Sequence, residues 1–216
     1  TKYRSQSASS NEVLLTGSRL AMMQQLSMAH QQVALVTLFD EVWVKWPTST
    51  KALPRLIAAL CAACEAEPKL NAWFTNNKLV LHKEVNLGLA VNTAHGLFVP
   101  VIHQANLLTQ VQLVKEIQKL KQAAQQHQLT PAQLQGATIS LSNFGMMAGR
   151  FATPMIVPPQ VAILGVGKIE QRAGLSKKGN IKTKTLIPLS LSFDHRILTG
   201  AEAAHFLAAF ITHIKK

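Results

Sequence analysis

The chain has 216 residues, of which 48% are hydrophobic and only 15% are charged. This balance excludes a disordered protein and fits one domain that buries a substantial core. Twenty-two lysines and arginines against ten acidic residues give a formal charge of +12, an excess that attracts phosphorylated small molecules, acidic proteins or nucleic acid. The basic residues are scattered and form no stripe with interleaved aromatics, so we do not expect nucleic acid as a partner.

The hydrophobic patterning predicts both helices and strands. Residues 1–12 are polar and serine-rich, which is typical of the end of a linker, so we expect the domain to span 13–216. In chain order the pattern predicts a helix at 14–30, a strand at 33–44, a helix from 54, two strands within 71–93, a strand at 96–106, helices at 108–128 and 129–136, strands at 137–145, 160–173 and 185–195, and a last helix from 200. This order predicts an α+β domain in which helices cover a mixed sheet.

Local signals mark several element boundaries. Thr16 or Ser18 is the candidate cap of the first helix. The pair at 76–77, both asparagine, predicts a hairpin turn. Pro54 suits the first turn of the second helix, and Gly136 suits the end of the short helix at 129–136.

The two cysteines, Cys61 and Cys64, fall three residues apart on one face of the second predicted helix. That position favours core thiols in a reducing compartment over a redox pair, which needs a strand-to-helix turn before the first cysteine. The histidines do not cluster like ligands, and we expect no metal. No apolar run reaches the roughly 20 residues of a membrane span, and no signal-peptide pattern is present, so we expect neither membrane insertion nor secretion.

The segment SLSFDHRILTG places His195 where the last strand gives way to the last helix. On its own such a histidine is more often an ordinary polar residue than a catalytic one. The run F-D-H-R-I-L-T-G, however, resembles the signature D-H-R-x-x-[DN]-G of the dihydrolipoamide acyltransferases, the E2 cores of 2-oxoacid dehydrogenase complexes, and the related H-x-x-x-D-G of chloramphenicol acetyltransferase. The stretches NLGLAVNTAHGLFVPVI, ATISLSNFG, PPQVAILGVGKI and LTGSRLAMMQQL resemble further segments of the same family in the same order, from about residue 14 to 213.

The resemblance implies a chloramphenicol acetyltransferase-like two-layer sandwich, a mixed β-sheet covered by helices, that assembles as a homotrimer. It also implies transfer of an acyl group between dihydrolipoamide and coenzyme A, both bound as substrates. His195 would take the proton of the incoming thiol, and Ser142 would donate a hydrogen bond to the oxyanion. The family site lies between two subunits, with Ser142 on one and His195 on the next.

The resemblance assigns supporting roles to other residues. Asp194 and Arg196 would form structural ion pairs beside the histidine, and Asn143 would fix the turn that carries Ser142. Gly200 would permit tight entry into the last helix. Arg19, in the first helix, aligns with a recurrent family arginine and is a weak candidate for binding coenzyme A.

Three features depart from the family pattern. Thr199 stands where the family has an aspartate or asparagine that orders the site and binds the tetrahedral intermediate; its shorter, uncharged side chain is expected to reduce activity. Between residues 44 and 53 relatives carry a further helix, whereas this chain has only KWPTSTKA. The chain ends on HFLAAFITHIKK without the family's hydrophobic tail, so we expect a trimer rather than a 24- or 60-subunit shell.

The resemblance further implies that the lipoyl group is carried on a separate domain absent from this chain, and that the E1 and E3 components of the complex bind through domains not present here. The expected location is the bacterial cytoplasm or the mitochondrial matrix. The acyl group stays open among acetyl, succinyl and branched-chain. Three alternatives remain: a non-catalytic or impaired core scaffold, a free-standing acetyltransferase of the chloramphenicol type and, most distantly, nucleic-acid binding.

Overall fold

A computed structural model describes residues 14–46, 52–94, 96–146, 148–175, 179 and 181–216. The predicted linker end, residues 1–12, therefore lies outside the described residues, as does most of the short segment before the second helix. The helices are α1 (Gly17–Gln32), α2 (Ala52–Ala66), α3 (Gln110–Gln125) and α4 (Gly200–Ile214), with 3₁₀ turns η1 (Pro68–Leu70), η2 (Ala105–Leu107), η3 (Pro131–Leu134) and η4 (Phe144–Met146).

A mixed sheet of seven strands forms the centre of the domain. Its order is β1-β11-β9-β8-β4-β7, and β10 pairs with the outer part of β11. β8 runs parallel to β4 and β9, and the other pairs are antiparallel. The strands are β1 (Leu35–Val44), β4 (Leu87–Leu89), β7 (Val101–Ile102), β8 (Ile139–Asn143), β9 (Ala162–Val166), β10 (Glu170–Leu175) and β11 (Ile181–Asp194); β2 (Ala72–Thr75) pairs with β3 (Lys78–Leu81), and β5 (Val91–Thr93) with β6 (Gly96–Phe98).

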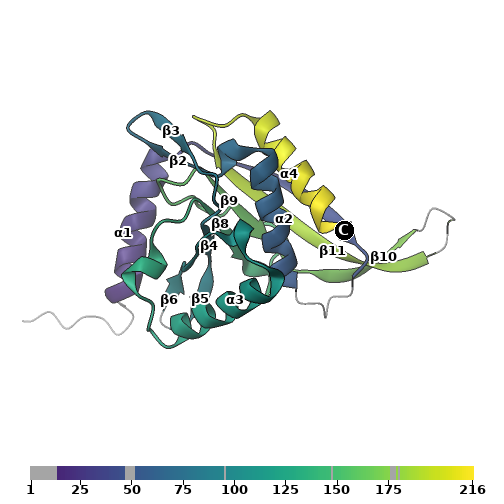
Figure 1. Ribbon diagram of the computed structural model, residues 1–216, viewed down its shortest axis with the longest axis horizontal. Helices are drawn as coiled ribbons and strands as arrows, with labels where there is room; N and C mark the ends of the chain where they lie inside the picture. The colour runs from purple at the N-terminus through teal and green to yellow at the C-terminus, as the bar shows by residue number, and fades with distance from the viewer. Residues whose placement is uncertain (1–13, 47–51, 95, 147, 176–178, 180) are drawn as a thin grey trace, which may run out of the picture.

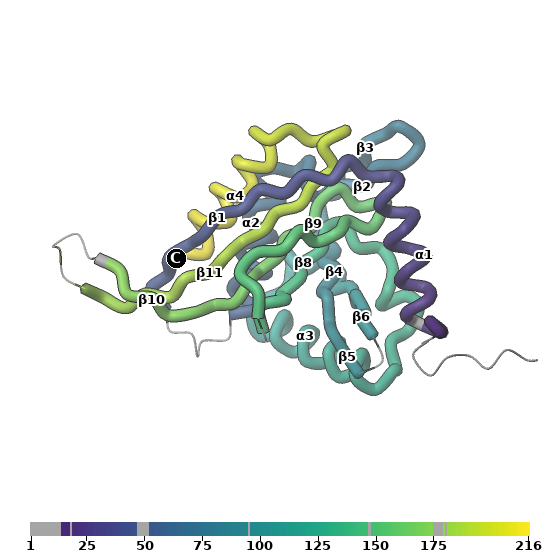
Figure 2. Tube along the Cα trace, turned by 180° about the vertical axis from the view of Figure 1, so that it is seen from behind, coloured from purple at the N-terminus to yellow at the C-terminus, as the bar shows by residue number. Residues whose placement is uncertain are grey.

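Helices α2, α3 and α4 cover one face of the sheet, so the predicted two-layer arrangement is confirmed (Figure 1). Seen from behind, the strands lie in front of these helices, and α1 stands at one end of the domain while the β10–β11 hairpin extends from the other (Figure 2). The layers meet in one core to which α4 contributes Phe206 and Phe210, both fully buried. Burial of such apolar surface is the main force holding the helices to the sheet.

β11 is the longest strand of the sheet, and His195 directly follows it. Its last ten residues, 185–194, are buried, and it lies between β1 on one side and β9 on the other. Thr37 and Ser192 share a hydrogen bond of 2.7 Å between their hydroxyls, and the Ala152 N–H donates to Ser190 Oγ, so the polar side chains of this buried strand are paired. The strand therefore holds its C-terminal end, where His195 follows, in a fixed place.

Several local signals are confirmed. Asn76 and Asn77 both have positive φ, as a tight hairpin turn between β2 and β3 requires. Cys61 and Cys64 are buried free thiols, and burial raises the pKa of Cys61 to about 12 and raises the pKa of Cys64 well above its usual range. Both are unreactive at neutral pH because the thiolate is the nucleophile. Thr16 occupies the N-cap position of α1 without making a side-chain capping bond.

Two predicted strands are in fact broken into shorter pieces. The strand predicted at 96–106 is interrupted at Pro100, which has no N–H for a ladder bond, and yields β6, β7 and η2. The strand predicted at 160–173 becomes β9 and β10, which pair one after the other with β11 and run in the same direction along it. The pairing is interrupted at residues 167–169, and its register shifts by one residue across the gap. Among the described residues, no helix is long and apolar enough to cross a bilayer.

We predict that Phe206→Ala lowers the free energy of unfolding by about 3–5 kcal/mol, because it leaves a cavity where α4 packs on the sheet. Val111→Ala, on the exposed face of α3, is the matched control and should change it by less than about 0.5 kcal/mol. Urea unfolding at one fixed chain concentration measures both. Equal effects of the two substitutions would contradict the packing described above.

Candidate functional site

The turn that follows β11, residues 195–199, is organised by Asp194. The backbone carbonyl of Asp194 accepts hydrogen bonds from the N–H groups of Ile197 (3.1 Å) and Leu198 (3.0 Å). Its side-chain Oδ1 accepts from the N–H groups of Ala34 (3.3 Å) and Arg196 (3.1 Å). The buried Asp194 thus holds the turn at residues 196–198 and also binds Ala34, the residue before β1.

Asp194 also forms a forked ion pair with Arg196. The guanidinium Nη2 lies 2.6 Å from Oδ2, and Nε lies 3.0 and 3.1 Å from the two carboxylate oxygens. The hydrogen bond to Asp194 raises the pKa of Arg196, whose guanidinium also lies 5.4 Å from the ring centre of Phe74. These contacts agree with the structural role expected of both residues and give them no chemistry of their own.

His195 lies between these contacts and is exposed on the single chain. The backbone N–H of His195 donates to the backbone carbonyl of Ala34 at 2.8 Å, and the centre of the imidazole ring lies 5.6 Å from that of the Phe193 ring. In the part of the chain that the structure describes, no group hydrogen-bonds to the imidazole. The backbone therefore places this ring, and both ring nitrogens remain available to an incoming group.

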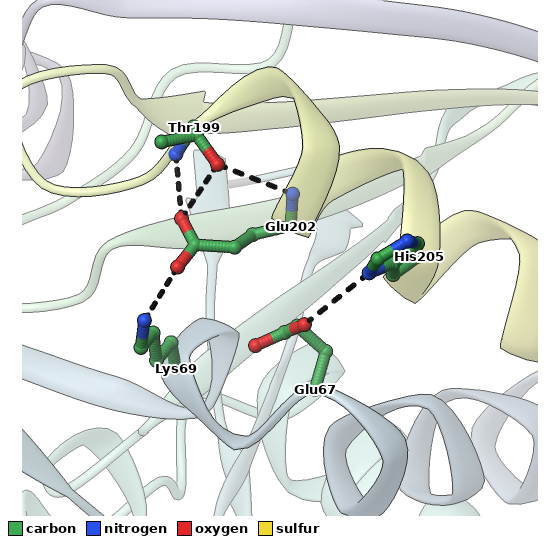
Figure 3. Close-up of polar contacts among 5 residues, drawn as sticks. All are labelled: Glu67, Lys69, Thr199, Glu202 and His205. Carbon is green, nitrogen blue, oxygen red and sulfur yellow. Dashed lines mark hydrogen bonds and ion pairs between the residues drawn. The ribbon is translucent and has the colours of Figure 1, made fainter.

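Thr199 is the N-cap of α4 rather than a free side chain facing His195. Its hydroxyl donates to Glu202 Oε2 (2.9 Å) and accepts from the Glu202 N–H (3.3 Å), which completes a capping box (Figure 3). Lys69 donates to the other carboxylate oxygen of Glu202 at 2.6 Å. The family motif predicts a catalytic position for Thr199, where relatives have aspartate or asparagine; the structure shows its side chain already engaged in holding the start of α4.

Ser142 lies near the end of β8 and is half-buried. No described residue hydrogen-bonds to its hydroxyl or to the side chain of Asn143, so the hydroxyl is free to donate elsewhere, and the predicted fixing role of Asn143 stays a prediction. The turn after Ser142 is instead held by close packing. A Cβ on Gly145 would come within 2.0 Å of the backbone of Gly167, and one on Gly167 within 2.0 Å of the Arg150 carbonyl.

This glycine packing was missed in the sequence, although both glycines stand in the quoted segments ATISLSNFG and PPQVAILGVGKI. The expectation for Gly200 needs correction. A Cβ added there would meet nothing within 4 Å, and the residue is an ordinary first position of α4, so the structure does not require glycine at this point.

Ser142 and His195 of one chain lie far apart. Ser142 is opposite Gly165 of β9, which is opposite Ser190 of β11. His195 lies five residues farther along β11, or about 16 Å at the rise of an extended strand, and two strand spacings to the side add about 10 Å. The sheet therefore separates the two predicted catalytic groups by about 19 Å within a single subunit.

Arg19 is exposed on α1, 13 residues before the end of that helix. This places Arg19 about 20 Å along the helix axis from the turn that carries His195, so within one chain Arg19 and His195 do not share a site.

A cavity of about 980 Å³ opens between α2, α3 and the strand β3, with Cys61, His82 and Lys83 among its lining residues. Neither His195 nor Ser142 lines this cavity. The described residues contain no group of three or more His, Cys, Asp or Glu able to hold a metal.

Residues 7–216 match the family described as 2-oxoacid dehydrogenases acyltransferase, catalytic domain. The chain belongs to this family. It is 37% identical over 180 residues to the dihydrolipoyllysine-residue acetyltransferase component of the pyruvate dehydrogenase complex of Staphylococcus aureus, covering 82% of this chain and 41% of that protein. It is 34% identical over 166 residues to the mitochondrial lipoamide acyltransferase component of the branched-chain α-keto acid dehydrogenase complex of Arabidopsis thaliana, covering 76% of this chain and 34% of that protein.

The fold agrees with this membership. A structure of Azotobacter vinelandii dihydrolipoamide acetyltransferase superposes with a TM-score of 0.88 at 28% identity, covering 95% of this chain and 91% of that one. Chloramphenicol acetyltransferase superposes with a TM-score of 0.59 at 13% identity over 89% and 94% of the two chains, which confirms the predicted fold class. The chain spans about two fifths or less of the length of the Staphylococcus aureus and Arabidopsis thaliana relatives.

We predict that Asp194→Asn lowers the free energy of unfolding by about 1–3 kcal/mol, because the amide faces Arg196 with an N–H₂ where a buried carboxylate oxygen now accepts. Glu170→Gln is the matched control: Glu170 also pairs with an arginine two residues away, Arg172, but the Glu170 side chain is 32% exposed, against 3% for that of Asp194. Glu170→Gln should lower the free energy of unfolding by at most about 1 kcal/mol. Thermal unfolding of both variants at neutral pH measures the difference, and a control effect as large as that of Asp194→Asn would refute the structural role.

Proposed function

We propose that this domain transfers an acyl group between dihydrolipoamide and coenzyme A at sites formed between neighbouring subunits of a homotrimer. The separation of Ser142 and His195 across the sheet carries this proposal. Both groups are needed at one thioester, and a single chain places them about 19 Å apart. A second copy that brings its Ser142 to the exposed His195 completes the site.

The single chain offers apolar surface for such an assembly. On α1, which packs only loosely on the rest of the domain, Leu20, Met22, Met23 and Met28 expose large apolar side chains. Phe39 on β1 and Phe151 form an exposed aromatic pair with ring centres 5.5 Å apart. Groups of exposed apolar side chains of this kind mark contacts with another protein, and head-to-tail contacts between identical copies close into rings such as trimers.

The chemistry follows from the free imidazole and the free hydroxyl. A thiol has a pKa near 8.5, so little thiolate exists at neutral pH, and His195 supplies a base that removes the S–H proton. The thiolate attacks the thioester carbonyl, a C–S bond forms, and the oxygen becomes negative. The Ser142 hydroxyl donates to that oxyanion. When the original C–S bond breaks, the imidazolium returns its proton to the departing thiolate.

Thr199 modifies this scheme. The Azotobacter vinelandii structure was determined to address the role of a serine, a histidine and an asparagine four residues after that histidine in the catalytic mechanism of that enzyme. Thr199 occupies the same spacing after His195, but its hydroxyl donates to Glu202. We infer that Thr199 contributes by holding the turn rather than by contacting the intermediate, and that turnover is lower than in relatives with asparagine.

The engagement of Thr199 in the cap is also the observation that favours the second candidate, an impaired or non-catalytic core scaffold of the same complex. The free hydroxyl of Ser142 and the free ring of His195 support the enzyme. The charge of +12 suits coenzyme A, which carries phosphates. A lipoyl group presented by a separate domain, and the E1 and E3 components, are the proposed partners; the matched relatives are bacterial and mitochondrial, and the bacterial cytoplasm or mitochondrial matrix is the proposed location.

We predict that His195→Ala reduces acyl transfer from acyl-coenzyme A to dihydrolipoamide by about 10²–10⁴-fold, because the thiol loses its base. His103→Ala, an exposed histidine in the turn after β7, is the control and should keep most of the activity. Thiol release from acetyl-, succinyl- and branched-chain acyl-coenzyme A measures the rates. A wild-type chain inactive with every donor would favour the scaffold over the enzyme.

We predict that mixing His195→Ala chains with Ser142→Ala chains restores activity that neither variant has alone. Every mixed trimer then contains one site with both groups intact, so equal mixing after dissociation and refolding should recover about a quarter of the wild-type rate. The same treatment applied to each variant alone is the control. If no activity returns although mixed trimers form, a site shared between subunits is excluded.

A further inference from the structure

A polar network joins the start of α4 to η1, the short turn that follows α2. This cap network consists of Lys69, Thr199 and Glu202 (Figure 3). Glu202 Oε2 accepts from the Thr199 N–H at 2.7 Å and from its hydroxyl at 2.9 Å, while Oε1 accepts from Lys69 Nζ at 2.6 Å. A single carboxylate therefore connects the last residue of the His195 turn to a separate element of the fold.

Both ends of the network are anchored in the core. Lys69 lies in η1, next to the fully buried Leu70. On the other side, Glu202 is followed in α4 by Ala203 and Phe206, which are also fully buried. The ion pair thus connects two rigid elements, and any movement of Thr199 must stretch one of its bonds.

The turn 195–199 is consequently fixed at its two ends by different groups. Asp194 holds the beginning through the N–H groups of Arg196, Ile197 and Leu198. The cap network holds the end at Thr199. His195 lies between them, its backbone N–H donates to the carbonyl of Ala34, and no described side chain hydrogen-bonds to its ring. The position of the imidazole therefore depends on how the backbone of this turn is held.

We propose that Lys69 and Glu202 are positioning residues for His195, acting through Thr199, in the acyl transfer assigned to this site. The inference rests on that proposed function, and it adds two residues that touch neither substrate. Misplacement of a catalytic group by about 1 Å costs up to about a hundredfold in rate, so an anchor of this kind affects turnover more than folding.

The charges around the network keep it intact at neutral pH. The hydrogen bond from Lys69, followed by that from the Thr199 N–H, lowers the pKa of Glu202 to about 2, and the bond to Glu202 raises the pKa of Lys69. The carboxylate therefore stays ionised above its ordinary pKa near 4.5, and its contribution is lost only as the pH falls toward 2. Two further ionisable groups face this region, Glu67 and His205, which lie 4.0 Å apart.

The test compares variants of the cap network with a matched ion pair elsewhere. Lys69→Met and Glu202→Gln remove its charges one at a time, and Lys69→Arg keeps the cation. Lys119→Met and Glu116→Gln make the same changes in the exposed Lys119–Glu116 pair of α3. Because exposed ion pairs contribute little to stability, all of these chains should fold, with melting temperatures within about 3 °C of the wild type.

We expect Lys69→Met and Glu202→Gln to lower kcat for acyl transfer about tenfold while leaving KM for both thiols within about twofold. Lys69→Arg should recover most of the rate, and both α3 controls should match the wild type. Hydrogen–deuterium exchange of the peptide 195–202 should be about tenfold faster in Lys69→Met and Glu202→Gln only, because without the ion pair the side chain at residue 202 that accepts from the Thr199 N–H is no longer held in place.

Unchanged exchange in that peptide, or an unchanged kcat in an active enzyme, would overturn the positioning role. A fall in kcat that the α3 controls reproduce would overturn it as well, because net charge alone would then explain the loss. If the wild type transfers no acyl group from any donor, the proposed function fails, and the exchange measurement still decides by itself whether the cap network holds the turn.

Discussion

The pairing register of β11 is the constraint on which the rest of the structure depends. This strand is buried between β1 and β9, and its register fixes where His195 emerges relative to Ser142. Because a strand advances about 3.3 Å per residue, the five-residue step from Ser190 to His195 cannot be shortened without losing the core pairing. The same order that stabilises the domain therefore makes one chain insufficient for the chemistry.

The molecule holds its two reactive groups by different means. The hydrogen bonds of Asp194 and the cap network hold the His195 turn at both ends. The Ser142 turn is held by backbone packing, in which Gly145 and Gly167 approach too closely for any side chain. In both places the supporting contacts leave the reactive side chain itself unpartnered within the described residues. Such a group breaks no hydrogen bond within the described protein when a substrate arrives, so the protein around it need not rearrange.

Much of the fold could be predicted from local patterns, because helical spacing, β-branched runs and turn residues act within a few residues of each other. The helix α3, the hairpin at Asn76–Asn77 and the last strand and helix all followed from such signals. The break in the strand at 96–106 could not, since β6 and β7 pair with different strands, β5 and β4. The break at 160–173 could not either: β9 and β10 both pair with β11, and the interruption between them lies where Gly167 packs against the distant carbonyl of Arg150. Likewise the motif located Thr199, but its engagement with Glu202 and Lys69 depends on how α4 packs beside η1.

The central claim is that an imidazole of one subunit and a hydroxyl of the next meet at one thioester. An experimental structure of the assembled protein with coenzyme A bound tests this most directly, through the distance from His195 Nε2 to Ser142 Oγ of the neighbouring copy. We predict about 5–7 Å, which leaves room for one reacting carbonyl between them. An assembly in which every His195 ring faces bulk solvent, or lies no nearer to a neighbouring Ser142 than the roughly 19 Å within one chain, would contradict the account.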